Sequence, residues 1–80
     1  MTNTIRVAAA QFAAGIDIEE NLQTCIRMID AASVHQPDIL VLPEFCNHAS
    51  WYQTQDHAYE VAVELDGFFT QAIAAKAKEY

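Results

Sequence analysis

Basic side chains are scarce in this 80-residue chain, which has 4 lysines and arginines against 11 aspartates and glutamates. Its net charge is -7 at pH 7. Proteins that bind nucleic acid need clustered lysine and arginine to neutralise phosphates, and anionic membrane surfaces attract the same clusters. The composition therefore argues against nucleic acid and against a membrane surface as partners.

Glycine, proline and cysteine are also rare, with two of each. So few turn-forming residues exclude a linker region, and a hydrophobic fraction of 52% excludes disorder. The two cysteines, Cys25 and Cys46, have no CxxC spacing, which fits a reducing compartment. No apolar run is long enough to span a membrane, and the first residues do not resemble a signal peptide. We therefore expect a cytoplasmic protein.

The chain is also short, and a domain of this size buries only about 60% of its unfolded surface. It stops at Tyr80 within a helical pattern, before any glycine, proline or capping residue. We therefore expect residues 1–80 to be an incomplete part of a single domain.

One stretch brings an apolar strand to an abrupt stop with a carboxylate just beyond it. Residues 39–42 are four consecutive large aliphatics, which predicts a strand covered on both faces, as in a parallel sheet under helices. Pro43 has no N–H to donate, so the strand ends there. Open α/β sheets place ligand sites beyond the carboxyl ends of parallel strands, which makes Glu44 the main candidate functional residue.

A strand over residues 5–12 and a helix precede this stretch. Asp17 followed by Glu20 resembles a capping box that starts the helix. Apolar residues then recur at helical spacing: Ile18, Leu22, Cys25, Ile26, Ile29 and Ala32. The opposite, polar face holds Glu19, Gln23, Arg27 and Asp30. Strand, helix and strand form a βαβ unit with parallel strands, so the predicted fold class is α/β.

The second half of the chain gives weaker signals. Residues 46–56 are polar and aromatic without periodicity, which is typical of a loop around a site. Residues 59–65 alternate apolar and polar side chains, which favours an extended segment, with a short helix as the second interpretation. A further helix opens after residues 66–67, with an apolar face that holds Phe69, Ile73, Ala77 and Tyr80.

Glu44 has a competing interpretation, in which it is a structural carboxylate that caps a turn or pairs with an arginine. Cys46, two residues on, could be a nucleophile with Glu44 or His48 as its base, although a partly buried, unreactive thiol is the simpler interpretation. Cys25 falls in the apolar stripe of the first helix and is assigned to the core.

Other polar residues have simpler structural explanations. Trp51 and Tyr52 either line a substrate pocket or pack the loop down. Lys76 and Lys78 are interpreted as a solvated helix end. Four side chains could in principle bind zinc, but their spacing matches no standard motif: Glu44, Cys46, His48 and His57.

In their order and spacing, these elements resemble the N-terminal part of the nitrilase superfamily of carbon-nitrogen hydrolases. The resemblance covers nearly the whole chain, and its motifs are specific together rather than singly. It rests on residues 7–11 (VAAAQ), on Asn21 and Leu22 early in the helix, on residues 37–44 (PDILVLPE), and on residues 65–68 (LDGF) before an alanine-rich helix.

The resemblance implies a four-layer αββα sandwich, of which residues 1–80 would form the βαβ start. Members of the family use a Glu, Lys and Cys triad on linear amides, carbamoyl compounds or nitriles. Glu44 matches the glutamate, and we expect the apolar strand before it to bury it in part so that it can hold a proton. The lysine and the nucleophilic cysteine belong to later strands. Lys76, Lys78, Cys25 and Cys46 match neither motif.

We therefore expect a hydrolase of non-peptide C–N bonds whose residues 1–80 are inactive alone. The resemblance implies no metal or organic cofactor, a small-molecule amide or nitrile as substrate, and a homo-oligomer. The main alternative is an α/β binding or interaction module in which Glu44 is structural.

Overall fold

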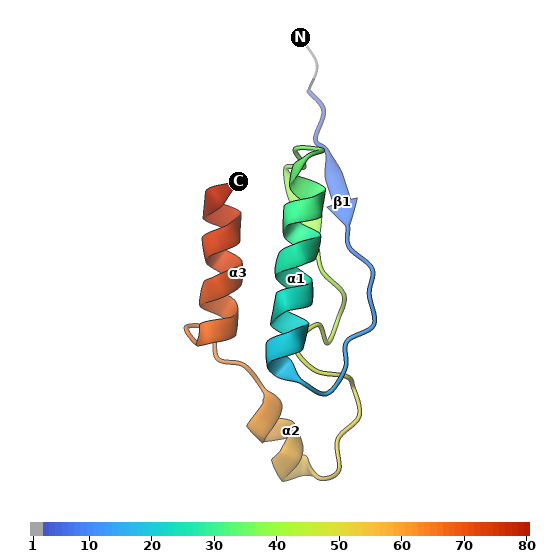
Figure 1. Ribbon diagram of the computed structural model, residues 1–80, viewed down its shortest axis with the longest axis vertical. Coiled ribbons are helices and arrows are strands. Elements are labelled where there is room, and N and C mark those ends of the chain that lie inside the picture. The colour runs from blue at the N-terminus through green and yellow to red at the C-terminus, as the bar shows by residue number, and fades with distance from the viewer. Residues whose placement is uncertain (1–2) are drawn as a thin grey trace.

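The computed structural model describes residues 3–80, which form two short strands and three helices. In chain order these are β1 (Val7–Ala9), α1 (Ile18–Ser33), β2 (Ile39–Val41), α2 (Gln55–Val61) and α3 (Phe68–Glu79). Figure 1 shows α1 and α3 side by side and running in the same direction. The fold class is α/β, as the sequence predicts.

β1 and β2 pair in parallel, with Val7 opposite Ile39, and α1 connects them. The predicted βαβ unit is therefore confirmed. Both strands are shorter than predicted, and the ladder stops after the Ala10 N–H donates to the Val41 carbonyl at 2.9 Å. The next bond of this register would need an N–H at residue 43. Because Pro43 has none, the pairing ends there.

The sheet is covered on one face only. Ala8 and Leu40 are half-buried, whereas their neighbours Val7, Ile39 and Val41 are 61%, 51% and 53% exposed. The prediction of a strand covered on both faces is therefore wrong for residues 3–80. Its physical reason is simple: the connecting helix of a βαβ unit lies on one side of the sheet, and no other element among these residues covers the second side.

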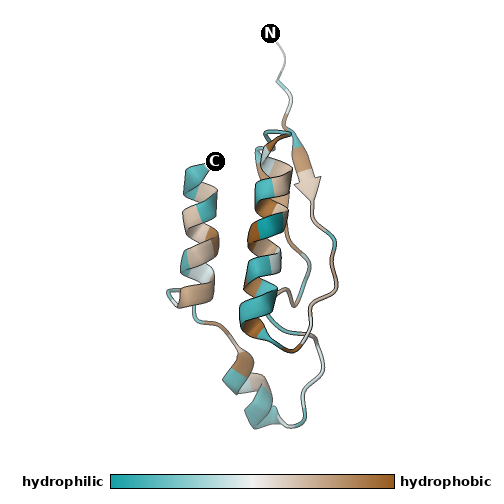
Figure 2. Ribbon diagram, in the orientation of Figure 1, coloured by the Kyte–Doolittle hydropathy of each residue, from teal (hydrophilic) through white to brown (hydrophobic). Residues whose placement is uncertain are grey.

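α1 begins where the sequence predicts. Asp17 is its N-cap, and the Asp17 carboxylate accepts a hydrogen bond from the Glu20 N–H at 3.2 Å. Figure 2 shows hydrophilic and hydrophobic residues alternating in bands along this helix, as expected for an amphipathic helix. Leu22 and Cys25 are buried with Phe69 of α3. Partly buried residues packed on this core are Phe12, Ile18, Ile26, Leu42, Cys46, Ala72 and Ile73.

The segment 59–65 is not the extended strand that its alternation favours. α2 covers Gln55–Val61, so the second interpretation, a short helix, holds for the first part of the segment. Thr54 starts this helix, because its hydroxyl accepts a hydrogen bond from the His57 N–H at 3.1 Å. α3 then begins after Gly67 as predicted. None of the helices within residues 3–80 is both long and apolar enough to cross a membrane.

A polar cluster joins the C-terminal ends of α1 and α3. Lys76 Nζ lies 3.0 Å from an Asp30 carboxylate oxygen and 3.1 Å from Glu79, and the Tyr80 hydroxyl donates to Asp30 at 2.7 Å. Hydrogen bonds from Tyr80 and then Lys76 hold the pKa of Asp30 below its usual range. Lys76 is therefore not a free helix end, because its partly buried side chain pairs with Asp30 at the surface. Lys78 is exposed, as expected.

Candidate functional site

Glu44 lies where the chain leaves the sheet. β2 ends at Val41, and Leu42 and Pro43 lead into a turn at Glu44 and Phe45. Because β1 and β2 are parallel, their carboxyl ends meet at the same edge of the sheet. Glu44 follows directly beyond that edge, the position at which α/β proteins place ligand sites.

The turn at Glu44 contains a strained backbone. Phe45 has φ 58°, in the left-handed region that bulky residues rarely adopt, at a cost of about 1–2 kcal/mol. The His48 N–H closes the turn by donating to the Phe45 carbonyl at 3.3 Å. Gln36 also has a positive φ, but it follows the end of α1, where such a conformation is common. Strain that a fold maintains concentrates at functional sites, so Phe45 favours a functional role for its neighbour.

The side chain of Glu44 is exposed. The expectation that β2 would bury it in part is therefore wrong within residues 3–80, because the chain turns away from the sheet at this residue. Both arginines are engaged elsewhere. The Arg6 guanidinium donates to the His35 carbonyl, and the Arg27 guanidinium donates to the Thr24 hydroxyl at 3.0 Å. The structure thus pairs neither arginine with Glu44, which removes one of the two roles that a structural carboxylate could have here.

Asn21 ties together the loops that surround this turn. The Asn21 side-chain oxygen accepts from the Gly15 N–H at 2.9 Å, and its amide nitrogen donates to the Gly15 and Asn47 carbonyls at 3.0 and 2.8 Å. The Ala49 N–H donates to the same Gly15 carbonyl at 2.8 Å. The sequence patterns did not predict this role of Asn21. Its signal was a polar residue within the buried stripe of an amphipathic helix, which is costly without hydrogen-bond partners.

Aromatic rings pack the loop after Glu44 down. His48 is 1% exposed, and its Nδ1 donates to the Ala49 carbonyl at 2.7 Å, which fixes the proton on Nδ1. The Tyr52 ring stacks on His48 with 5.6 Å between ring centroids. Trp51 meets His57 edge to face and stays 59% exposed. Packing therefore describes Tyr52, whereas Trp51 remains mostly exposed.

Cys46 packs against the core and is not paired with a base. It lies on the buried cluster of Leu22, Cys25 and Phe69, next to the fully buried Cys25 thiol. Burial, and then the neighbouring Cys46 thiol, raise the pKa of Cys25 to about 12. Cys25 therefore stays protonated and is a core residue, as predicted. His48 is directed to Ala49, so the unreactive interpretation describes Cys46 better than a Cys46–His48 pair does.

Comparison with known proteins identifies the family. The sequence model described as carbon-nitrogen hydrolase matches residues 6–80. The chain belongs to the carbon-nitrogen hydrolase family. This confirms the resemblance to the N-terminal segment of the nitrilase superfamily. No curated protein and no solved structure matches the chain.

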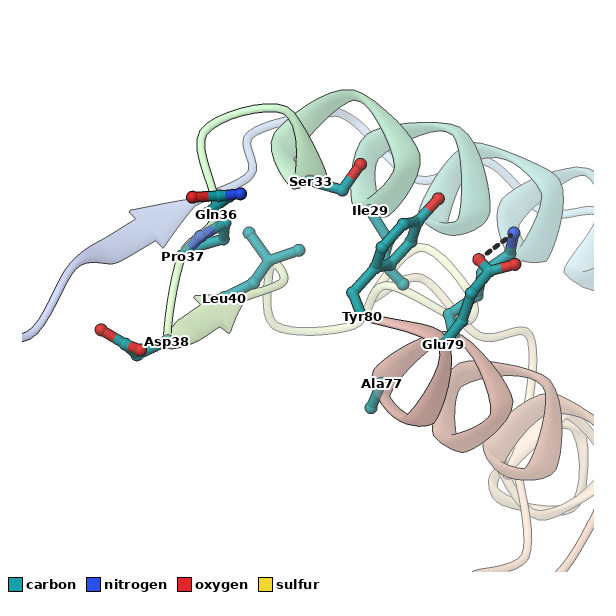
Figure 3. Close-up of a pocket in the computed structure, with 10 residues that line it drawn as sticks. Ile29, Ser33, Gln36, Pro37, Asp38, Leu40, Ala77, Glu79 and Tyr80 are labelled. Atoms are coloured by element: carbon teal, nitrogen blue, oxygen red, sulfur yellow. Dashed lines mark hydrogen bonds and ion pairs between the residues drawn. The ribbon is translucent and has the colours of Figure 1, made fainter.

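One hollow of this carbon-nitrogen hydrolase chain, within residues 3–80, lies at the far end of β2 from Glu44. Its volume is about 700 Å³, and Figure 3 shows it between the start of β2 and the C-terminal ends of α1 and α3. Leu40, Tyr80 and Glu79 line it, and Glu44 does not. We therefore place the candidate site at the Glu44 turn and not in this hollow.

Metal ligands do not gather in the part of the carbon-nitrogen hydrolase chain that the structure describes. Within residues 3–80, no three histidine, cysteine, aspartate or glutamate side chains come close enough to hold a metal ion. This includes Cys46, His48 and His57, whose spacing already failed to match a zinc motif. Of the residues singled out from the sequence, Glu44 alone combines a position directly beyond the strand ends with an exposed carboxylate.

Proposed function

We propose that Glu44 is the general base of a hydrolase that cleaves non-peptide C–N bonds in linear amides, carbamoyl compounds or nitriles. One observation carries the proposal. In a chain of the carbon-nitrogen hydrolase family, Glu44 occupies a strained turn directly beyond the carboxyl ends of two parallel strands. The lysine and the nucleophilic cysteine of the proposed Glu-Lys-Cys triad lie outside residues 1–80.

The chemistry needs a carboxylate because a thiol is a weak nucleophile when protonated. An unperturbed cysteine has a pKa of about 8.5, so most of it is protonated at neutral pH. The proposed role of Glu44 is to take this proton as the thiol attacks the carbonyl or nitrile carbon. For an amide, the attack forms the S–C bond and moves an electron pair onto the carbonyl oxygen, where the lysine ammonium stabilises the charge.

Glu44 then returns the proton during the same turnover. Protonated Glu44 gives the proton to the departing nitrogen as the C–N bond breaks, which releases ammonia or an amine and leaves a thioester. The carboxylate next removes a proton from water, which attacks the thioester. The C–S bond then breaks and Glu44 passes this proton to the departing sulfur, which leaves a carboxylic acid and the regenerated thiol. One carboxylate thus serves both half-reactions.

Holding a proton requires a less solvated carboxylate than residues 3–80 provide, since Glu44 is exposed among them. The uncovered apolar face of the sheet is an argument for a larger fold around Glu44. Val7, Ile39 and Val41 expose apolar surface that a second sheet would cover in the proposed four-layer αββα sandwich. The proposal therefore needs the intact protein, and we expect residues 1–80 alone to be inactive.

Substituting Glu44 by glutamine in the full-length protein tests the proposal. Glutamine keeps the size of the side chain but is not basic, so ammonia release from a panel of short linear amides and nitriles should fall by about 10²- to 10⁴-fold. The melting temperature should stay close to that of the wild type. The matched control is Glu60→Gln on α2, another exposed glutamate, which should keep its rate.

The same assay distinguishes the proposal from two alternative hypotheses, a structural Glu44 and a nucleophilic Cys46. If Glu44 is structural in a binding module, Glu44→Gln should lose thermal stability without any hydrolysis to lose. If Cys46 is the nucleophile, Cys46→Ala should be the inactive variant, and a thiol alkylating reagent should label Cys46 less when substrate is present. Near-normal ammonia release by Glu44→Gln would exclude the function proposed here.

A further inference from the structure

The Asn21 side chain is buried and makes three hydrogen bonds to the backbone of two loops. It is 5% exposed, and its carboxamide has one acceptor bond and two donor bonds. Only one orientation of the carboxamide fits these partners, because the flipped group would set its oxygen against two carbonyls. The interaction is therefore directional, and each bond has a defined partner.

These bonds join the two loops that follow the parallel strands. Gly15 lies in the loop between β1 and α1, and Asn47 lies in the loop after β2, three residues beyond Glu44. The Gly15 carbonyl receives a second hydrogen bond from the Ala49 N–H, which fastens the same loop once more. We refer to Gly15, Asn21, Asn47 and Ala49 together as the Asn21 clasp.

The Asn21 clasp fixes the exit of the Glu44 turn, while the end of β2 fixes its entry. Between these two points Phe45 is held at φ 58°. A bulky residue keeps this conformation only where its surroundings over-determine it, because relaxation would recover about 1–2 kcal/mol. Pro43 and the sheet hold one side of the turn, and the bond from Asn21 to the Asn47 carbonyl holds the other.

We propose that Asn21 is a positioning residue for catalysis, which acts through the Asn47 carbonyl to hold the strained Phe45 turn and thereby aim the Glu44 carboxylate. This inference rests on the proposed role of Glu44 as the general base. Asn21 touches neither substrate nor reacting atoms in this scheme. Its contribution is the geometry of Glu44, and a displacement of the order of 1 Å is enough to cost about 10²-fold in rate.

Asn21→Asp in the full-length protein is the sharpest variant. Aspartate keeps an oxygen to accept from the Gly15 N–H but replaces the amide donor with an oxygen that repels the Gly15 and Asn47 carbonyls. The matched control is Thr24→Ala on the same helix, which removes the hydrogen bonds that the Thr24 hydroxyl makes with the Glu20 carbonyl and with Arg27 and leaves the clasp intact. If Asn21→Asp does not fold, Asn21→Ser, which shortens the side chain without adding charge, replaces it.

The first measurement is independent of activity. A residue at positive φ has its N–H and Hα close together, so Phe45 should give a strong intraresidue N–H to Hα nuclear Overhauser effect in the wild type and in Thr24→Ala. In the folded Asn21 variant this signal should weaken, and the amide resonances of residues 44–48 should shift. An unchanged Phe45 signal in a variant that has lost the bond to Asn47 would overturn the inference.

The second measurement is a double-mutant cycle on ammonia release, at a temperature well below unfolding. Asn21→Asp should lower kcat by about 10- to 100-fold with a smaller change in KM, and it should cost nothing further when Glu44 is already glutamine. Additive losses would show that Asn21 does not act through Glu44 and would overturn the inference, while leaving the proposed function in place. Failure of the proposed function gives a different result: if Glu44→Gln alone retains its rate, Glu44 is not the general base, whatever the effect of Asn21→Asp.

Discussion

The two ends of α1 are held to the rest of the protein by different chemistry. At the N-terminal end, Asn21 is buried and makes neutral hydrogen bonds to backbone groups of two loops. At the C-terminal end, Asp30 forms an ion pair with Lys76 and accepts a hydrogen bond from Tyr80 at the surface. Both arrangements link segments that are distant in sequence, so their difference lies in burial and charge.

This difference decides how much each end of α1 contributes to the free energy of unfolding, and how strongly that contribution depends on salt. Breaking a buried hydrogen bond leaves a group without water or protein as a partner, which makes the loss large and insensitive to salt. An exposed ion pair gains little over its solvated charges and is screened by dissolved ions. The N-terminal end of α1, which Asn21 links to the loop after Glu44, is thus expected to depend less on salt and pH than the C-terminal end.

Removal of the Asn21 side chain should give the largest loss of stability. Asn21→Ala strips partners from the Gly15 N–H and from two carbonyls, so the free energy of unfolding should fall by about 1–3 kcal/mol. Urea unfolding of the full-length protein measures this change. Asn47→Ala is the control, because it removes a side-chain bond to the Val61 carbonyl but keeps the Asn47 carbonyl that Asn21 binds. An equal loss in both variants would contradict the special role of the N-terminal end.

Substitution of Phe45, in the strained turn, should give the second largest loss of stability. Phe45→Val places a β-branched residue at φ 58°, and we expect a loss of about 1–2 kcal/mol in the free energy of unfolding. Phe45→Gly is the matched variant, since glycine adopts this conformation without strain and should lose less. If valine is tolerated as well as glycine, the turn is not strained, and the argument from strain to function at Glu44 weakens.

The helix cap is expected to contribute somewhat less. Asp17→Ala removes the acceptor of the Glu20 N–H, and the free energy of unfolding should fall by about 1 kcal/mol. Asp17→Asn should retain most of the stability, because asparagine is an equally good N-cap. Melting temperatures of the two variants provide the measurement. Equal losses in both would mean that the charge near the helix dipole matters more than the capping bond.

The C-terminal cluster should show the smallest effect and the strongest dependence on conditions. Asp30→Asn removes the charge that pairs with Lys76 but keeps an oxygen for the Tyr80 hydroxyl. We expect a slight fall in melting temperature at low salt that disappears in about 1 M salt, where charges are screened beyond about 3 Å. Lys78→Met, at an exposed neighbour, should have no comparable salt dependence. A loss that persists at high salt would contradict a mainly electrostatic cluster.

The same cluster should respond to pH in both directions. The hydrogen bonds to Tyr80 and Lys76 lower the pKa of Asp30, so its contribution is present above the usual pKa of an aspartate and is lost as the pH falls through the lowered value. The bond to Asp30 raises the pKa of Tyr80, so that contribution is present below the usual pKa of a tyrosine and is lost as the pH rises through the raised value. Melting curves of wild type and Asp30→Asn should therefore differ most near neutral pH.

Local signals predicted the parts of the fold that local interactions determine. The cap at Asp17 and the apolar stripe that follows it predicted α1, and the aliphatic run before Pro43 predicted β2 and its parallel pairing. The alternation of residues 59–65 favours a strand, but so short a pattern fits a helix as well, and residues 59–61 belong to α2. The Thr54 cap, which starts α2, lies outside the alternation, so the alternation alone does not predict this helix.

The candidate site was less predictable, because its geometry depends on contacts between distant segments. The place of Glu44 beyond β2 follows from Pro43 and the parallel sheet, but its exposure depends on what covers the turn. Neither the bond from Asn21 to Asn47 nor the ion pair of Lys76 with Asp30 leaves a periodic signal, since each joins residues more than 20 positions apart. Sequence patterns located the candidate residue, and three-dimensional contacts were needed to explain its support.

The lengths of the helix and the strands of the βαβ unit do not match. α1 has 16 residues and is about 24 Å long, whereas each three-residue strand spans only about 10 Å. The N-terminal half of α1 therefore extends beyond the sheet. There the helix is covered by residues of the loops, Phe12, Leu42 and Cys46, and not by strand residues. Residues of the loops at the carboxyl ends of the strands thus pack against a regular helix, so the Glu44 turn is a loop that begins and ends next to a helical surface.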